Sequence, residues 1–245
     1  MILNHITWVR FPVAVPFDFF DLNIKKFMIS FDIITIFPKP VEDFIKEGLF
    51  RIALDKKIVD INVHDLRNWT SDKHKTVDDR PFGGGAGMLL KIEPIYKAIN
   101  DLKREGSEIW VTDAGGEIIN QQILHVRKDL AIKKKHVILI AGHYEGIDYR
   151  VLEHLATWTF SIGSFILSGG ELPILVLLDG LIRLLPGVLG NPDSLKEESF
   201  EESFLEYPQY TRPENFNGLR VPEVLLSGNH KLIKEWREKH KRKIN

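Results

Sequence analysis

Residues 136–148 read HVILIAGHYEGID, an apolar run that turns abruptly into a polar loop flanked by glycines. The apolar half predicts a buried β-strand. Residues 157–162 predict a second strand, again followed by a glycine-rich turn, SFILSGG, and then by a helix at 171–185 entered through Pro173. Because open α/β sheets bind ligands at the carboxyl ends of their strands, both glycine turns are candidate ligand loops.

The alternation of strand and helix extends toward the N-terminus. Apolar strands are predicted at residues 29–37, 58–63 and 108–112, and helices at residues 41–57, 93–105 and 121–132. Strands spaced by helices predict an α/β domain with a mainly parallel sheet.

The composition excludes several classes of protein. With 245 residues, 44% hydrophobic and 27% charged, the chain is expected to fold as one large domain or as a medium and a small one. The absence of cysteine excludes disulfides, thiolate metal sites and cysteine nucleophiles, and it fits a reducing compartment. The most apolar window, residues 172–189, carries Asp179 and Arg183, so we expect a soluble protein.

Three segments differ from the rest in composition. Residues 1–27 are apolar and aromatic but lack the basic region and cleavage site of a signal peptide. Because Met28 opens the first strand, one interpretation is an N-terminal extension that is not native. Residues 191–206 hold six acidic residues and one Lys, about −5, which predicts an acidic linker. Residues 229–245 hold seven Lys or Arg and two Glu, about +5, which predicts a basic helix. The net charge of −1 therefore conceals two opposed patches.

Residues 78–87, DDRPFGGGAG, place four glycines in five positions. The spacing does not fit a P-loop, and the segment follows a charged run rather than a strand, which excludes a Rossmann turn. A mobile surface loop and a ligand loop both stay open, although the neighbouring Asp78, Asp79 and Arg80 favour function. Likewise, the two turns after residues 141 and 161 are either ordinary connections or loops offering backbone groups to a flat ligand such as adenine.

Seven strings occur in fixed order between Met28 and the C-terminus: TVDDRPFGGGAGMLLKIEP, AGHYEGID, SIGSFILSGGELP, PGVLG, EESF, YPQYTRP and VPEVLLSGNH. In these strings the chain closely resembles the bacterial TrmD family of tRNA (guanine-N1)-methyltransferases. The resemblance implies a SPOUT-type α/β domain (28–188) whose deep trefoil knot holds S-adenosylmethionine, an acidic flexible linker (189–203) and a small helical C-terminal domain (204–245). It also implies a cytoplasmic homodimer that acts on the anticodon loop of tRNA, with no membrane or metal involved.

The resemblance further implies the roles of individual residues. Glu198 would be the general base and Arg183 the group that stabilises developing charge. Arg80, Arg212 and His230 would contact RNA, together with the basic C-terminal helix. The cofactor would be bound by Thr112, Gly142, Tyr144, Glu145, Ile162, Gly163, Ser164, Phe165, Ile166, Leu167, Gly169 and Gly170.

The chemistry of guanine methylation suits two of these residues. Guanine N1 carries a proton at neutral pH, so a carboxylate that accepts the proton makes N1 nucleophilic. The negative charge then moves to O6, where a guanidinium would stabilise it. Without the resemblance, Glu198 is equally a solvated linker acid and Arg183 equally a partner of Asp179, one helical turn away.

The chain departs from the family pattern in four places. Glu198 stands where the family usually has Asp, Phe165 where it has Tyr, and His143 where it has Arg. The C-terminal domain also looks shortened. The expected activity is methyl transfer from S-adenosylmethionine to N1 of guanosine 37 in tRNA. The alternatives are a knotted RNA-binding protein with weak or lost turnover and a SPOUT methyltransferase acting on another RNA base.

Overall fold

The computed structural model of this chain describes residues 28–190, 199–200 and 204–243. The predicted N-terminal extension and most of the predicted acidic linker, including Glu198, lie outside the described residues. Within the described ranges, every helix is too short or too polar to cross a bilayer.

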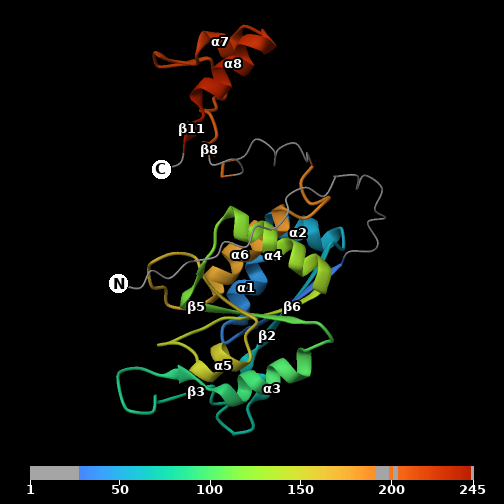
Figure 1. Cartoon of the computed structure of the whole chain (residues 1–245), viewed down its shortest axis with the longest axis vertical. Coiled ribbons are helices and arrows are strands. Elements are labelled where there is room, and N and C mark those ends of the chain that lie inside the picture. Colours follow the sequence, from blue (N-terminus) through green and yellow to red (C-terminus); the bar gives the residue numbers. More distant parts are fainter. Residues whose placement is uncertain (1–27, 191–198, 201–203, 244–245) are drawn as a thin grey trace, which may run out of the picture.

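A five-stranded parallel sheet forms the centre of the molecule, in the order β2-β1-β6-β5-β7 (Figure 1). The strands are β1 (Ile29–Thr35), β2 (Val59–Asp65), β5 (Glu108–Ile118), β6 (His136–Ile140) and β7 (Trp158–Ser161). Every residue of β1 and β6 is buried, as expected for central parallel strands that are covered on both faces. The predicted α/β class with a mainly parallel sheet is confirmed.

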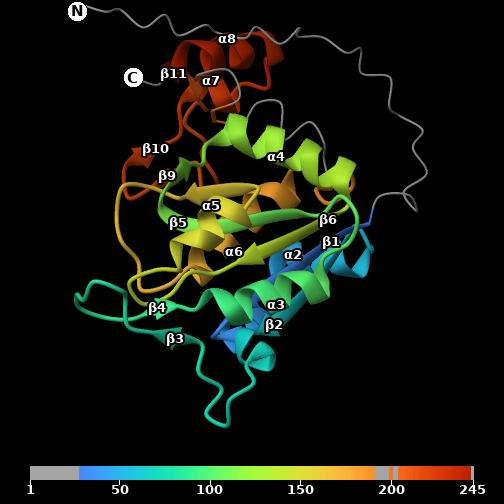
Figure 2. The same ribbon diagram turned by 60° about the horizontal axis from the view of Figure 1, so that its bottom comes forward.

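Helices cover both faces of this sheet (Figures 1 and 2). One face packs against α1 (Pro38–Phe44), α2 (Gly48–Asp55), α4 (Gln121–Lys134) and α6 (Glu171–Arg183), and the other against α3 (Ile92–Leu102), α5 (Tyr149–His154) and the 3₁₀ turn η2 (Leu66–Trp69). Each face of the sheet has its own hydrophobic core, and alternate residues of β6 point into the two cores. Val137 and Leu139 pack in the core under α1, α2, α4 and α6, and Ile138 and Ile140 pack in the core under α3 and α5.

Local details differ from the sequence-based expectation. The helix predicted at residues 41–57 is two helices, because Gly48 adopts a left-handed conformation (φ +58°) at the break between them. Helix α5 was not predicted. Strand β5 runs six residues beyond the predicted end at Thr112, to Ile118, because the chain bulges at residues 113–116 and then pairs again with β7.

The short elements outside the sheet form local pairs. Strand β3 (Asp78–Asp79) pairs with β4 (Leu89–Leu90), and the loop between them extends away from the sheet (Figure 2). The C-terminal elements are β8 (Phe204–Leu205), β9 (Asn215–Phe216), β10 (Leu219–Arg220), α7 (Glu223–Leu226), α8 (His230–His240) and β11 (Arg242–Lys243). None of the described residues from 204 to 243 is buried. Only two of these six elements, α7 and α8, are helices, so the C-terminal segment is helical only in part.

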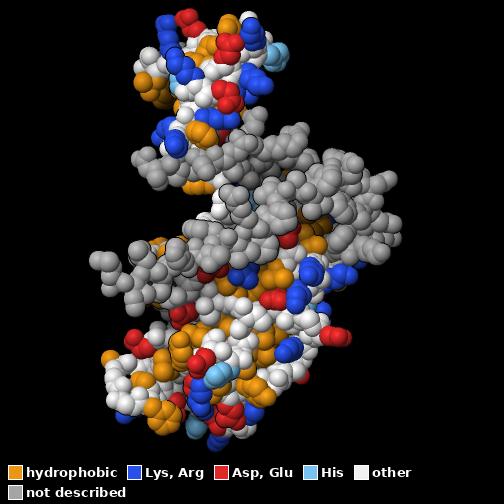
Figure 3. All heavy atoms as spheres, in the orientation of Figure 1, with side chains coloured by type: hydrophobic (Ala, Val, Ile, Leu, Met, Phe, Trp, Pro, Cys, Tyr) orange, Lys and Arg blue, Asp and Glu red, His pale blue; other side chains and the backbone are white. Residues whose placement is uncertain are grey.

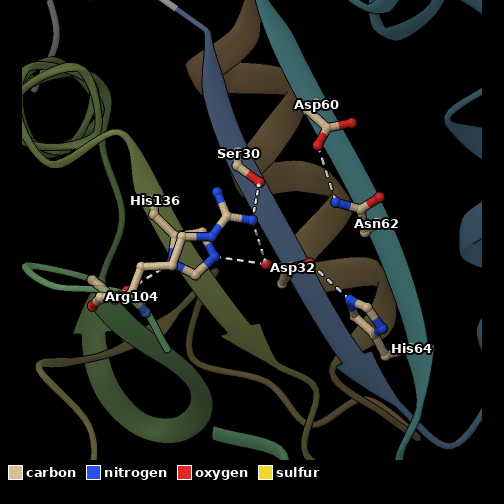
Figure 4. Close-up of polar contacts among 8 residues, drawn as sticks. Ser30, Asp32, Asp60, Asn62, His64, Arg104 and His136 are labelled. Atoms are coloured by element: carbon tan, nitrogen blue, oxygen red, sulfur yellow. Dashed lines mark hydrogen bonds and ion pairs between the residues drawn. The ribbon is translucent and has the colours of Figure 1, made fainter. Parts of the chain in front are cut away.

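A polar cluster is buried among the apolar side chains of the sheet, around Asp32 on β1 (Figure 4). The imidazole Nε2 atoms of His64 and His136 lie 2.7 and 2.6 Å from its two carboxylate oxygens. On the far side of His136, Nδ1 lies 2.6 Å from the hydroxyl oxygen of Ser107. Burial alone would raise the pKa of Asp32, but the hydrogen bonds from the two histidines outweigh it and hold the pKa below its ordinary value.

The ionised form of Asp32 should therefore stabilise the fold above about pH 4 and lose that effect as the pH falls through the lowered pKa. We expect Asp32→Asn to cost about 3 kcal/mol at pH 7, because it breaks a buried charged cluster. Urea unfolding between pH 7 and pH 3 measures this, and the difference from wild type should narrow below pH 4. Asp60→Asn, at a half-buried position on the neighbouring strand β2, is the control. An equal loss at every pH would contradict the prediction.

Candidate functional site

Thr112, just before the bulge of β5, lies beside the loops that leave the carboxyl ends of β6 and β7, and hydrogen bonds join the three segments. The N–H of Gly142, after β6, donates to Thr112 Oγ1 at 2.9 Å. The N–H of Gly170, after β7, donates to the carbonyl oxygen of Gly142 at 2.7 Å. Gly142 is thus held from both sides, by β5 and by the loop that precedes α6.

The two glycines after β7 leave no room for a side chain. A Cβ atom on Gly170 would lie 2.1 Å from Thr112 Oγ1 and 2.7 Å from the nitrogen of Gly142. One on Gly169 would lie 2.4 Å from His143 Nδ1. The sequence argument assigned these glycines to a ligand, but the structure shows that packing of one loop on the other already requires them.

The glycine-rich segment 83–87 reaches the same edge. The N–H of Glu145 donates to the carbonyl oxygen of Met88 at 3.1 Å, and the N–H of Leu90 donates to that of Gly146 at 2.9 Å. A Cβ atom on Gly87 would lie 2.3 Å from Glu145 Cγ. The segment therefore borders the loop after β6, and both readings of it stay open.

Polar side chains connect the start of α6 to the end of β1 and to the loop after β6. The hydroxyl of Thr35, at the end of β1, donates to Glu171 Oε1 at 2.6 Å. The other oxygen, Oε2, lies 3.7 Å from His143 Nδ1. The sequence analysis missed Thr35 and Glu171; the only available signal was the acidic residue at the first position of a helix that follows a glycine pair.

Apolar side chains are exposed beside these hydrogen-bonded segments. Tyr144 adopts a left-handed conformation (φ +60°) and is exposed, and so are Phe165 and Ile166 in the loop after β7. The Phe165 ring lies against Gly163, where a Cβ atom would be 2.5 Å from its Cε1. Backbone donors and acceptors next to aromatic and aliphatic surface can bind a ligand with a flat body and polar edges.

The bulge of β5 is braced on the side facing α4. Trp158 Nε1 donates to Glu117 Oε2 at 2.7 Å, and the Arg127 guanidinium lies over the Trp158 ring, 3.9 Å from its centroid. Burial lowers the pKa of Arg127, although the hydrogen bond to Glu117 acts in the opposite direction. This cluster holds residues 113–118 against β7, next to Thr112.

The remaining predicted site residues lie elsewhere. Arg183 is half-buried at the last position of α6, so it lies roughly 20 Å along the helix axis from Gly170. Arg80 is exposed beside β3, and Arg212 and His230 are exposed in the C-terminal segment. Of the predicted cofactor residues, Thr112, Gly142, Gly169 and Gly170 are in direct contact. Tyr144, Glu145 and the loop 162–167 flank them. Among the described residues, no group of three His, Asp or Glu could hold a metal ion.

These features define an α/β protein in which glycine-rich loops gather at the carboxyl edge of a parallel sheet, the edge at which open α/β sheets bind ligands. The comparison with protein-family models identifies the family: residues 29–244 match the model described as tRNA (Guanine-1)-methyltransferase TrmD. The chain belongs to this family, as the resemblance in the sequence predicted.

Individual relatives agree with the family match. The chain is 50% identical to the tRNA (guanine-N(1)-)-methyltransferase of Dictyoglomus turgidum over 212 residues, 86% of this chain and 84% of the relative. It is 49% identical to the enzyme of the same name from Nostoc punctiforme over 208 residues, 84% and 86% of the two chains. The enzyme of that name from Clostridioides difficile is 43% identical over 219 residues, 87% and 93%.

Proposed function

We propose that this protein transfers a methyl group from S-adenosylmethionine to N1 of guanosine at position 37 of tRNA. The observation that carries the proposal is the meeting of Thr112 of β5 and the loops after β6 and β7 at Gly142, in a chain about 50% identical to tRNA (guanine-N(1)-)-methyltransferases over most of its length. Incubation with labelled S-adenosylmethionine and tRNA transcripts carrying G or A at position 37 tests it. Transfer to the G37 transcript alone is expected, and equal labelling of both would favour another target base.

The residues at the sheet edge suit the proposed methyl donor. S-adenosylmethionine combines a flat adenine with polar edges, and it supplies an activated methyl group on a sulfonium. Backbone groups of the loop after β6 and of the loop 162–167 would hydrogen-bond the adenine edge. The exposed rings of Tyr144 and Phe165 would cover its faces. The hydroxyl that Phe165 lacks is not needed for such stacking.

Two charged side chains would act on guanine. The carboxylate of Glu198 would accept the N1 proton, and Arg183 would stabilise the charge that develops on O6. Arg183 of the same chain lies too far along α6 from the cofactor loops to meet the methyl group, unless the site combines residues of two chains.

We propose a homodimer, because in a dimer Arg183 of one chain could meet the cofactor loops of the other. Leu172 and Val176 are both exposed on α6, one helical turn apart, and Phe165 and Ile166 are exposed in the loop that precedes this helix. Such a face is typical of a surface that a second copy covers. Sedimentation should detect a dimer, and a stable, fully active monomer would contradict the proposal.

The connection from β7 to α6 supports a deep knot. This loop leaves the edge strand β7, passes Thr112 of β5 and reaches the loop after β6, where the N–H of Gly170 donates to the carbonyl oxygen of Gly142. The bulge of β5 at 113–116 lies between the two stretches of β5 that pair with β7. We propose that the loop threads the preceding segment, as in the SPOUT trefoil knot. We also propose that residues 28–188 form the catalytic domain, 189–203 the linker and 204–245 the small C-terminal domain.

The C-terminal segment is the proposed tRNA surface. Lys and Arg side chains are exposed on its elements, with acidic side chains between them (Figure 3). On α8, the Arg237 guanidinium lies over the Tyr207 ring, 4.8 Å from its centroid. Arg212 and His230 are exposed on the same segment, whereas Arg80 would contact RNA from the loop beside the cofactor site.

Deleting residues 239–245 should weaken tRNA binding and flatten its salt dependence. This deletion removes Lys239, Lys241, Arg242 and Lys243, and each lost phosphate contact reduces the salt slope by about 0.9. Binding assays between 50 and about 200 mM salt measure the slope, and cofactor affinity serves as the internal control. An unchanged slope would mean that this end of α8 is only a solvated surface.

A further inference from the structure

We propose that His143 is a positioning residue that aligns the two cofactor loops by pairing with Glu171. The inference rests on the proposed function, because it concerns affinity for the methyl donor.

The first observation is the orphaned nitrogen of His143. Its Nδ1 is buried and has no hydrogen-bond partner among the described residues. The nearest acceptor is Glu171 Oε2, at 3.7 Å, which is an ion-pair distance but too long for a hydrogen bond. A buried polar atom without a hydrogen bond costs free energy. A shift of less than about 1 Å that brings Nδ1 of His143 within hydrogen-bond distance of Glu171 Oε2 is therefore favourable.

The second observation is that Glu171 cannot easily move toward His143. Its other oxygen accepts a 2.6 Å hydrogen bond from Thr35 at the end of β1, and the residue lies in the first turn of α6. The adjustment must therefore come from the loop that carries His143. Glu171 acts as the fixed anchor of the pair.

The third observation concerns what moves with His143. Gly169 pairs with His143 as an isolated β-bridge, and a Cβ atom on Gly169 would lie 2.4 Å from both His143 Nδ1 and Glu171 Oε2. The next residue, Gly170, holds the carbonyl of Gly142. Closing the His143–Glu171 gap thus draws together the loop after β6 and the loop after β7, which form two walls of the proposed cofactor site.

The imidazole is also oriented by its neighbours. The edges of the Phe37 and Tyr144 rings contact it, with centroids 4.9 and 5.0 Å away. Because these contacts limit rotation of the ring, Nδ1 stays directed at Glu171. They also couple His143 to Tyr144, the left-handed residue beside the proposed adenine site.

A double-mutant cycle on cofactor affinity tests the proposal. His143→Phe keeps the ring contacts but removes Nδ1, and Glu171→Gln keeps an oxygen for Thr35 but removes the charge. Titration calorimetry with S-adenosylmethionine should show about tenfold weaker binding for each single variant and no further loss for the double variant. His143→Arg restores a donor toward Glu171 and should bind within about threefold of wild type.

Two controls separate this role from a structural one. Thermal unfolding without ligand should be similar for His143→Phe and for His154→Phe, an exposed histidine on α5 that pairs with its neighbour Glu153. Additive losses in the cycle, or a loss of stability that accounts for the weaker binding, would overturn the inference. If wild type itself did not bind S-adenosylmethionine, the proposed function would fail first. If wild type bound S-adenosylmethionine and the His143 and Glu171 variants bound it equally well, only the role of His143 would be overturned, and the proposed function would stand.

Discussion

Replacing Glu198 with Gln should lower the single-turnover rate of methyl transfer by a factor on the order of 10² to 10⁴. The amide keeps the shape of the side chain but cannot accept the N1 proton of guanine. Cofactor affinity should change little, because the loops that form the proposed cofactor site leave β5, β6 and β7, far along the sequence from residue 198.

The neighbouring acids provide the controls for this prediction. Glu197→Gln and Glu201→Gln should transfer the methyl group at near wild-type rates. Glu198→Asp restores the side chain usual in the family and should retain activity. If Glu198→Gln transferred the methyl group at a near wild-type rate while Glu197→Gln or Glu201→Gln lost activity, the general base would be Glu197 or Glu201 and not Glu198.

Gly170→Ala should weaken cofactor binding by a factor on the order of 10². The added Cβ would lie 2.1 Å from Thr112 Oγ1, 2.7 Å from the nitrogen of Gly142 and 2.9 Å from Ala141 Cα, so backbone must move. A misplacement of about 1 Å in such a site is enough for an effect of this size. Titration calorimetry measures the affinity, and circular dichroism checks that the sheet persists.

Gly190→Ala is the matched control, because a Cβ atom there would meet nothing within 4 Å. Gly142→Ala should have an intermediate effect, since its nearest contact would be the carbonyl oxygen of Thr112 at 3.3 Å. If Gly170→Ala folded and bound the cofactor with wild-type affinity, the hydrogen-bonded residues Thr112, Gly142 and Gly170 would not belong to the cofactor site.

Local pattern predicted the sheet strands and most helices. Runs such as ISFDIIT and HVILI are apolar throughout, because a central parallel strand is buried on both faces, and that requirement acts on each residue separately. The family was also recognisable from the sequence, because its motifs are continuous strings of residues that can be matched without knowledge of the fold. The break at Gly48 and the helix α5 were missed, because short helices leave too few turns for a periodic signal.

The sequence by itself determined the α/β class, the family and most of the residues at the edge of the sheet. Only the tertiary structure decided how those residues meet: Gly170 with Gly142, Gly87 with Glu145, and Thr35 through Glu171 with His143. The same structure separated Arg183 from the cofactor loops. The physical reason is that these contacts depend on strand order and on the path of the loop after β7. Strand order follows from the packing of the whole chain and leaves no local pattern.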